Sequence, residues 1–319
     1  MKKLLYILAS LALFAALLIF PKAAGEAVRS ALSMCAQLII PSLFPFFIAV
    51  NLMSELGAAR TAANALSPLA AKLLGISGYG AAAFIIGVTG GYPLGAAYIA
   101  QLRKKLLVSQ KEASLLLIFC NNSGPAFIIG AVGIGVFSSV SLGFFLYAVH
   151  IAAALIVGII ISPKSPCDIC YDEAEVSAPS FSSAFTASVK SSAEAVISIC
   201  AFIAAFSALN GILGGMGIIS SLAGEMAHTS GFELGWCRAL LAGLLELGNG
   251  IGAMSGFEAT PQSLALAAFI LSWGGLSVHF QTFAMIDETD IKTARYVIGR
   301  LFTALIAAAL ALLGAVIMF

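Results

Sequence analysis

The stretch "VTGGYPLGAA", residues 88–97, decides the fold because it places three glycines and a proline inside a strongly apolar segment. Proline removes a backbone donor and kinks a helix, and glycine weakens one. At membrane depth, each backbone group freed in this way needs a partner inside the protein or in a water-filled cavity. The stretch therefore predicts a turn of the chain inside the membrane rather than a continuous helix.

The composition is that of a membrane protein. The 319 residues are 61% hydrophobic and only 10% charged, and the mean hydropathy is +1.04. A soluble domain carries about 25% charged residues. The apolar segments have the length that crosses a lipid bilayer, and they cover residues 4–20, 30–56, 78–101, 112–136, 139–162, 189–213, 236–256, 262–286 and 296–319. We expect an all-α polytopic membrane protein. The net charge of +1, without a basic run, argues against a nucleic-acid partner.

The N-terminal stretch "MKKLLYILASLALFAALLIFPKAAGE", residues 1–26, resembles a signal peptide. Its apolar core, residues 4–20, is longer than a usual signal core and just long enough to cross the bilayer. We expect an uncleaved first transmembrane helix. Cleavage after "KAAG" is the alternative.

The positions of the basic residues favour a topology with two hairpins. If all nine apolar segments cross, the basic cluster around Arg103 lies outside, against the rule that positive residues gather on the cytoplasmic side. If segments 78–102 and 236–257 are re-entrant hairpins, about seven spans remain, with the N-terminus cytoplasmic and the C-terminus outside. Three basic residues then face outward: Lys22, Arg29 and Arg238. The others lie inside: Lys2, Lys3, Arg60, Lys72, Arg103, Lys104, Lys105, Lys111, Lys164, Lys190, Lys292, Arg295 and Arg300.

The two halves of the chain resemble each other on either side of a polar linker, residues 163–188. "VTGGYPLGAA" corresponds to "LELGNGIGAM" (245–254), and "CNNSGP" (120–125) corresponds to "ILSWGG" (270–275). Each half also has a short amphipathic segment, at 57–75 and 214–235. Each half contains three spans, so the second, 189–319, is inverted relative to the first, 27–162. This predicts an inverted repeat as in many secondary transporters. Chance similarity between alanine- and glycine-rich helices is the alternative.

The four breaks are expected to converge on one polar cavity that binds a small-molecule solute. Freed amide groups favour anionic groups and freed carbonyls favour cations. Asparagine side chains both donate and accept hydrogen bonds, and Tyr92 and Trp273 offer faces for a planar ring. The candidate substrate-binding residues are Thr89, Gly90, Gly91, Tyr92, Asn121, Asn122, Ser123, Asn249, Ser272, Trp273 and Ser277.

Glu246 is the one acidic residue that this topology places deep in the membrane, where ionisable groups usually serve function. It is the candidate ion-coupling residue, with Na⁺ or H⁺ as the coupling ion. The alternative is a carboxylate that caps freed amide groups of its own hairpin. His279 is equally compatible with a structural and a functional role. No metal and no resident cofactor is expected.

Enzymatic function is not expected. The sequence contains no HExxH, GxSxG or P-loop motif, and the acidic "IDETD" (286–290) is expected to form a solvated loop at a cytoplasmic helix end. Cys167 and Cys170 form a lone CxxC in the linker. Such a pair is redox-active or half of a zinc site, but a second ligand pair is missing. Their role stays open.

Three stretches carry a family resemblance: "IIPSLFPFFI" (39–48), "GYPLGA" (91–96) and "CNNSGPAFIIGAVG" (120–133). The order of elements resembles the concentrative nucleoside transporter fold, and the motifs are similar to the nucleoside-recognition or Gate domain family. More narrowly, they resemble the sporulation integral membrane protein YlbJ family of spore-forming Firmicutes. In nucleoside transporters the hairpin tips and following breaks hold nucleoside and sodium. This chain has "TGGYP" where those transporters have a polar Gln-Thr-Glu cluster.

The resemblance implies a transporter. The sporulation family is linked to cortex formation and to movement of dipicolinate, an aromatic dicarboxylate. We therefore expect a cell-membrane transporter, with the forespore membrane as one location, for a small polar, anionic aromatic solute. A nucleoside or nucleobase carrier on the same scaffold is one alternative. A non-transporting scaffold or signalling protein of sporulation is another. The oligomeric state, a homo-oligomer included, stays open.

Overall fold

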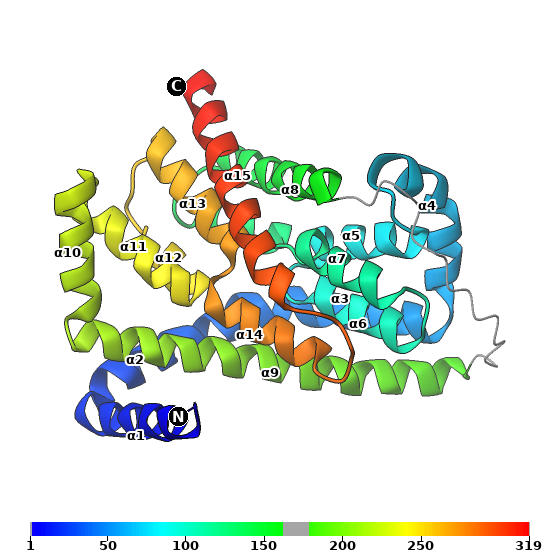
Figure 1. Cartoon of the computed structure of the whole chain (residues 1–319), viewed down its shortest axis with the longest axis horizontal. Helices are drawn as coiled ribbons and strands as arrows, with labels where there is room; N and C mark the ends of the chain where they lie inside the picture. The colour runs from blue at the N-terminus through cyan, green and yellow to red at the C-terminus, as the bar shows by residue number, and fades with distance from the viewer. Residues whose placement is uncertain (1, 162–178, 319) are drawn as a thin grey trace.

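The computed structural model describes residues 2–161 and 179–318. Within these residues every regular element is helical, so the predicted all-α fold is confirmed (Figure 1). Cys167 and Cys170 lie outside the described residues, as does most of the predicted linker.

The first half contains α1 (Lys2–Ile19), α2 (Pro21–Met34), η1 (Cys35–Ile39), α3 (Ile40–Glu55), α4 (Ala58–Leu74), α5 (Gly78–Gly90), α6 (Leu94–Lys104), α7 (Gln110–Cys120), η2 (Ala126–Ile134) and α8 (Val140–Ile161). The second half contains α9 (Phe181–Gly215), α10 (Ile218–Ser230), α11 (Leu234–Leu245), α12 (Leu247–Gly252), α13 (Pro261–Trp273), α14 (Gly275–Ile286) and α15 (Ala294–Met318). The elements η1 and η2 are π-helical.

Five helical segments of the described chain are long and apolar enough to cross a membrane: Pro21–Glu55, Val140–Ile161, Phe181–Gly215, Pro261–Ile286 and Ala294–Met318. Each coincides with a predicted span, and two of them, Pro21–Glu55 and Phe181–Gly215, begin well before the predicted start. The predicted span 112–136 is divided into α7 and η2 by an irregular stretch at 121–125, where the sequence predicted a break. Helix α1 is a shorter apolar helix. The helix α9 begins at 181 because Ser180 caps it, accepting a hydrogen bond from the Ser183 amide.

In Figure 1, α9 runs along the lower edge, beside α2 and α3, and α15 crosses the middle next to α13. The two short segments α4 and α10 stand upright at opposite ends of the view. Buried apolar side chains form two clusters. One lies among α3, α5, α6, α7 and α9, and the other among η2, α8, α13 and α15. The candidate site lies where these clusters meet.

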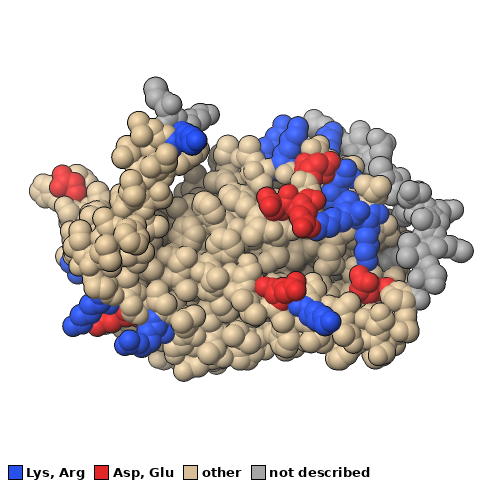
Figure 2. Space-filling model, turned by 90° about the horizontal axis from the view of Figure 1, so that it is seen from below, with Lys and Arg blue, Asp and Glu red and all other residues tan. Residues whose placement is uncertain are grey.

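The surface has the polarity of a protein in a lipid bilayer. In Figure 2 most of the visible face carries neither acidic nor basic side chains, and those that are visible gather in a few groups. Large apolar side chains are exposed along the outward faces of α1 and α15, as at Phe14, Leu313 and Ile317. Such side chains are stable in contact with lipid rather than water.

Candidate functional site

The first break is a tight turn between α5 and α6. The helix α5 ends at Gly90, Gly91 has a φ of +92°, and the Tyr92–Pro93 peptide is cis. A Cβ atom on Gly87 would lie 1.7 Å from the carbonyl oxygen of Cys120, and one on Gly95 would lie 2.2 Å from the same oxygen. The chain therefore doubles back at this turn, and α5 and α6 both touch the end of α7 through glycine.

The second half contains a similar helix pair. The helix α11 ends at Leu245, Glu246 is extended, and α12 begins at Leu247. A Cβ atom on Gly250 would lie 2.3 Å from the Cα atom of Gly243, so α11 and α12 also pack through glycine on either side of the turn. The Glu246 carboxylate accepts a hydrogen bond of 2.7 Å from the backbone amide of Asn249 and thereby caps the start of α12. The alternative role predicted for Glu246, a carboxylate that caps a freed amide group of its own helix pair, is thus present.

The breaks touch each other in pairs, one pair in each half. A Cβ atom on Gly91 would lie 2.8 Å from the backbone nitrogen of Gly124. In the second half, α13 ends at Trp273 and is followed by Gly274 and Gly275, both with positive φ. A Cβ atom on Gly275 would lie 3.0 Å from the Glu246 Cα atom. In both halves, therefore, the turn of the helix pair packs against the break of the following helix, backbone to backbone.

A cavity of about 60 Å³ lies where the two pairs of breaks meet. Five of the residues predicted from the sequence line it: Gly90, Gly91, Tyr92, Ser123 and Glu246. Its remaining wall is largely apolar and comes from both halves. The other lining residues, most of which the sequence did not single out, are Met34, Ile39, Ser42, Leu43, Gly124, Ala126, Phe127, Ile199, Ile203, Leu247, Gly248, Val278 and Gln281.

Six other candidates lie behind the cavity wall and bond to protein groups. The side-chain amide of Asn121 donates to the hydroxyls of Thr282 and Tyr296, and the side-chain amide of Asn122 donates to the Phe119 carbonyl. The others pair as follows: Asn249 with Ser207, Ser272 with His150, Trp273 with the Leu244 carbonyl, and Ser277 with Gln281. Thr89 is exposed, and its hydroxyl donates to the Ile85 carbonyl of its own helix.

Arg300 is the main feature of this region that the sequence analysis missed. It was counted among the cytoplasmic charges. In the structure it belongs to α15, and its side chain is fully buried in the protein interior. Its guanidinium donates to the Tyr92 hydroxyl and to the Ser272 carbonyl, and at 3.5 Å to the Ile118 carbonyl and the Asn122 amide oxygen. Arg300 therefore connects the breaks of the two halves.

Two buried histidines flank the same region. The Nε2 atom of His150 accepts a hydrogen bond of 3.0 Å from the Ser123 amide, and its Nδ1 atom lies 2.8 Å from the Ser272 hydroxyl. This ring joins the break after α7 to the end of α13. The His279 ring lies between Trp273 and Tyr296 in tilted contacts, with ring centroids 4.3 and 5.2 Å away. Its contacts fit a packed aromatic cluster.

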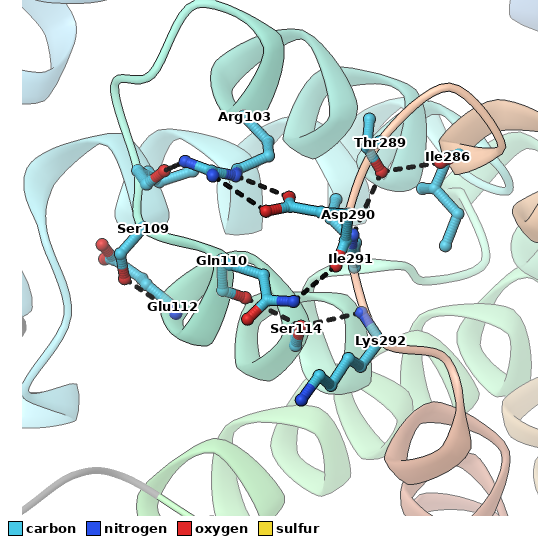
Figure 3. Close-up of polar contacts among 11 residues, drawn as sticks. Arg103, Ser109, Gln110, Glu112, Ser114, Ile286, Thr289, Asp290, Ile291 and Lys292 are labelled. Atoms are coloured by element: carbon cyan, nitrogen blue, oxygen red, sulfur yellow. Dashed lines mark hydrogen bonds and ion pairs between the residues drawn. The ribbon is translucent and has the colours of Figure 1, made fainter.

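The acidic stretch "IDETD" is tied to the end of α6 and the start of α7 (Figure 3). Arg103 forms a two-pronged ion pair with Asp290 at 2.8 and 2.9 Å, and Gln110 donates to the Asp290 carbonyl. Lys104 pairs with Glu288. Hydrogen bonds from Arg103 and Lys104 hold the pKa values of Asp290 and Glu288 below their usual range. The acidic loop is thus exposed, as predicted, but it also joins the two halves.

A second acidic side chain is buried in the protein besides Glu246. Glu112, 1% exposed, lies in the first turn of α7 and accepts a hydrogen bond of 2.8 Å from the Ser77 amide. Ser77 in turn caps α5. Glu112 therefore fixes the start of α5 relative to α7. Its signal in the sequence is the "SQKE" capping pattern before an apolar run, residues 109–112.

Comparisons with known proteins agree on the fold and the family. Residues 36–140 match the Gate family, described as "Nucleoside recognition". The sporulation integral membrane protein YlbJ of Bacillus subtilis (strain 168) is 30% identical over 92% of this chain and 78% of its own length. Among solved structures, a variant of CNTnw in its intermediate 3 state aligns with a TM-score of 0.55 at 15% identity, covering 98% of this chain and 86% of that one. A second CNTnw variant, in an outward-facing state, gives 0.52 at 15% identity, covering 98% and 83%. At this identity the two structures show the shared fold.

Proposed function

Because the chain belongs to the family of the sporulation integral membrane protein YlbJ, and is thus an integral multi-pass membrane protein, we propose that it is a transporter. Its solute is a small, polar, anionic aromatic molecule of the dipicolinate type, which crosses a bacterial membrane by alternating access. The observation that carries the proposal is the cavity enclosed by paired helix breaks from both halves. Substrate sites of secondary transporters lie at such breaks, between inverted repeats.

The proposal includes the finer topology. The helix pairs α5–α6 and α11–α12 are re-entrant hairpins, and seven segments span, with α7 and η2 together forming one of them. The first inverted repeat is 27–162 and the second is 189–319, with α1 as the N-terminal anchor and 163–188 as a cytoplasmic linker. The opposite positions of α4 and α10 in Figure 1 support two inverted halves. The N-terminus is cytoplasmic and the C-terminus lies outside.

The chemistry of the cavity supports a planar anionic solute. Tyr92 offers an aromatic face, and the apolar wall around it suits a ring. Ser123 and Gly124 precede η2, whose amide end favours negative charge. Glu246 lines the cavity as the coupling group for Na⁺ or H⁺. The cavity now has room for only a few water molecules. Entry of a ring therefore requires the breaks to separate, as alternating access demands.

A nucleoside or nucleobase carrier is the second candidate. The "Nucleoside recognition" match over 36–140 favours it. The small number of polar side chains on the cavity wall opposes it, because base and ribose edges need several directed hydrogen bonds. The third candidate function is not transport: the protein would be a membrane scaffold of sporulation that moves no solute.

Uptake into proteoliposomes tests these candidates. We expect saturable uptake of labelled dipicolinate, with no competition from excess uridine or adenine. Gly91→Ala should abolish uptake because its Cβ would meet the Gly124 backbone at a positive φ. Thr89→Ala is the matched control in the same hairpin, since Thr89 faces away from the cavity. Nucleoside uptake would replace the first candidate with the second. If the folded protein moved none of these solutes, the membrane scaffold would remain as the candidate function.

A further inference from the structure

Arg300 is a cation in the protein interior. Its side chain is 0% exposed, and a guanidinium stays protonated in proteins. Among the described residues no aspartate or glutamate forms an ion pair with it; its partners are carbonyl oxygens, an amide oxygen and a phenol. A buried charge without compensation is costly. Its surroundings must therefore supply negative potential in another form.

Two helix ends supply that potential. Ile118 lies in the last turn of α7 and Ser272 in the last turn of α13, and both carbonyls accept from the guanidinium. The carbonyl end of a helix carries roughly half a negative charge, so two ends offset about one cation. The Tyr92 ring adds its negative face, with the guanidinium carbon 5.3 Å from the ring centroid. Arg300 thus neutralises the carbonyl sides of both breaks.

The opposite side of the first break lies at the cavity, which Ser123 and Gly124 line just before η2. Helix α14, which follows the second break, contributes Val278 and Gln281, which lie beyond its first three residues. Both helices begin just after a break, so their amide ends carry partial positive charge. Without Arg300, the carbonyl ends behind them would cancel that charge. With Arg300 in place, the positive potential of the amide ends remains. The Glu246 carboxylate, also at the cavity, is bonded to the first turn of α12.

We propose that Arg300 sets the charge selectivity of the cavity. It acts as a positioning residue that never contacts the solute: it holds the carbonyl ends of α7 and α13 and leaves the positive potential of the amide ends available to a carboxylate-bearing ring. This inference rests on the proposed function, because it takes the cavity to be the solute site. It adds a residue and a physical reason for preferring an anion over a neutral molecule of the same shape.

Calorimetric binding to the purified full chain tests the proposal with two probes of one shape. Pyridine-2,6-dicarboxylate carries two charges, and pyridine-2,6-dicarboxamide carries none. We expect the wild-type protein to bind the dicarboxylate at least tenfold more tightly. Arg300→Gln should weaken dicarboxylate binding tenfold or more and change diamide binding less than threefold. Arg300→Lys keeps the charge and should retain the preference. Arg238→Gln, at an exposed arginine of α11, is the matched control and should change neither affinity.

Two results would overturn the proposal. One is an equal loss of both affinities in Arg300→Gln, which is what a purely structural residue would give. The other is a wild-type protein that binds neither probe, or binds them equally well, and this measurement needs no variant to fold. The binding readout is also independent of flux. A charge preference without uptake would refute transport alone, and uptake without a charge preference would refute the role of Arg300 alone.

Discussion

Substituting Gly87 by alanine tests the packing that makes the first helix pair. A Cβ atom there would lie 1.7 Å from the Cys120 carbonyl oxygen, whereas carbon and carbonyl oxygen normally approach to about 3.3 Å. The backbones of α5 and α7 would have to separate by roughly 1.5 Å. The nearest atom is backbone, so no side-chain rotation relieves the contact. Overpacking of this kind typically costs about 1–3 kcal/mol.

The expected loss is measurable as thermal stability in detergent. In domains of about 150–250 residues each 1 kcal/mol shifts Tm by about 2–4 °C, so in this somewhat larger chain Gly87→Ala should lower Tm by up to roughly 10 °C. Uptake should also fall, because the end of α7 leads directly into the break at Asn121. The control is Gly224→Ala in α10, where a Cβ atom meets nothing within 4 Å. A Gly87→Ala protein with wild-type Tm and uptake would refute the packing and, with it, the reason for the glycine.

Three further predictions concern other parts of the molecule. Glu246→Gln keeps an oxygen to accept from the Asn249 amide, so Tm should change little while the Na⁺ or H⁺ dependence of uptake disappears; unchanged ion dependence would reject its coupling role. Asp290 has a pKa lowered by its hydrogen bond to Arg103, so its stabilising effect is present above the ordinary carboxyl pKa and lost as pH falls through the lowered value. Asp290→Asn should therefore lower Tm near neutral pH and remove part of the decline in acid; a parallel acid decline in both proteins would contradict this. Lys111→Cys, with the linker cysteines replaced by serine, should react with an impermeant reagent from the cytoplasmic side alone, and labelling from outside would reject the hairpin topology.

The positions of the breaks could be read from the sequence because their signals are local. Glycine and proline inside an apolar run mark a break whatever surrounds them, and the chain does turn at Gly91 and leave its helix at Gly274. The inversion of the second half followed from the same breaks and from the placement of lysine and arginine, and it stays a proposal. Long uninterrupted helices were equally accessible, because length and hydropathy define them.

The roles of individual polar residues could not be read in the same way. Asn121 and Asn122 were expected to face the cavity, but each amide bonds to protein groups behind the wall. A buried amide first satisfies its own hydrogen bonds. The partners of Asn121 come from a distant part of the chain, whereas Asn122 donates to the nearby Phe119 carbonyl. Arg300 was missed for a related reason. Its burial depends on carbonyls near residues 118 and 272, which no local pattern brings together. Its position inside the apolar segment 296–319 was the available signal.

The contacts around the cavity suggest how the two halves can move relative to each other. Within each half, the hairpin turn touches the following break through backbone atoms, as at Gly91 and Gly124. Between the halves, the hydrogen bonds at this level involve side chains: Tyr92 to the Leu271 carbonyl, and His150 to the Ser272 hydroxyl. Close backbone packing does not deform gradually, whereas side-chain hydrogen bonds can exchange partners or water. The helix pair α5–α6 should therefore move together with α7 and η2, and the pair α11–α12 should move together with α13 and α14. At the level of the cavity, separation of the two halves would therefore first break these side-chain hydrogen bonds.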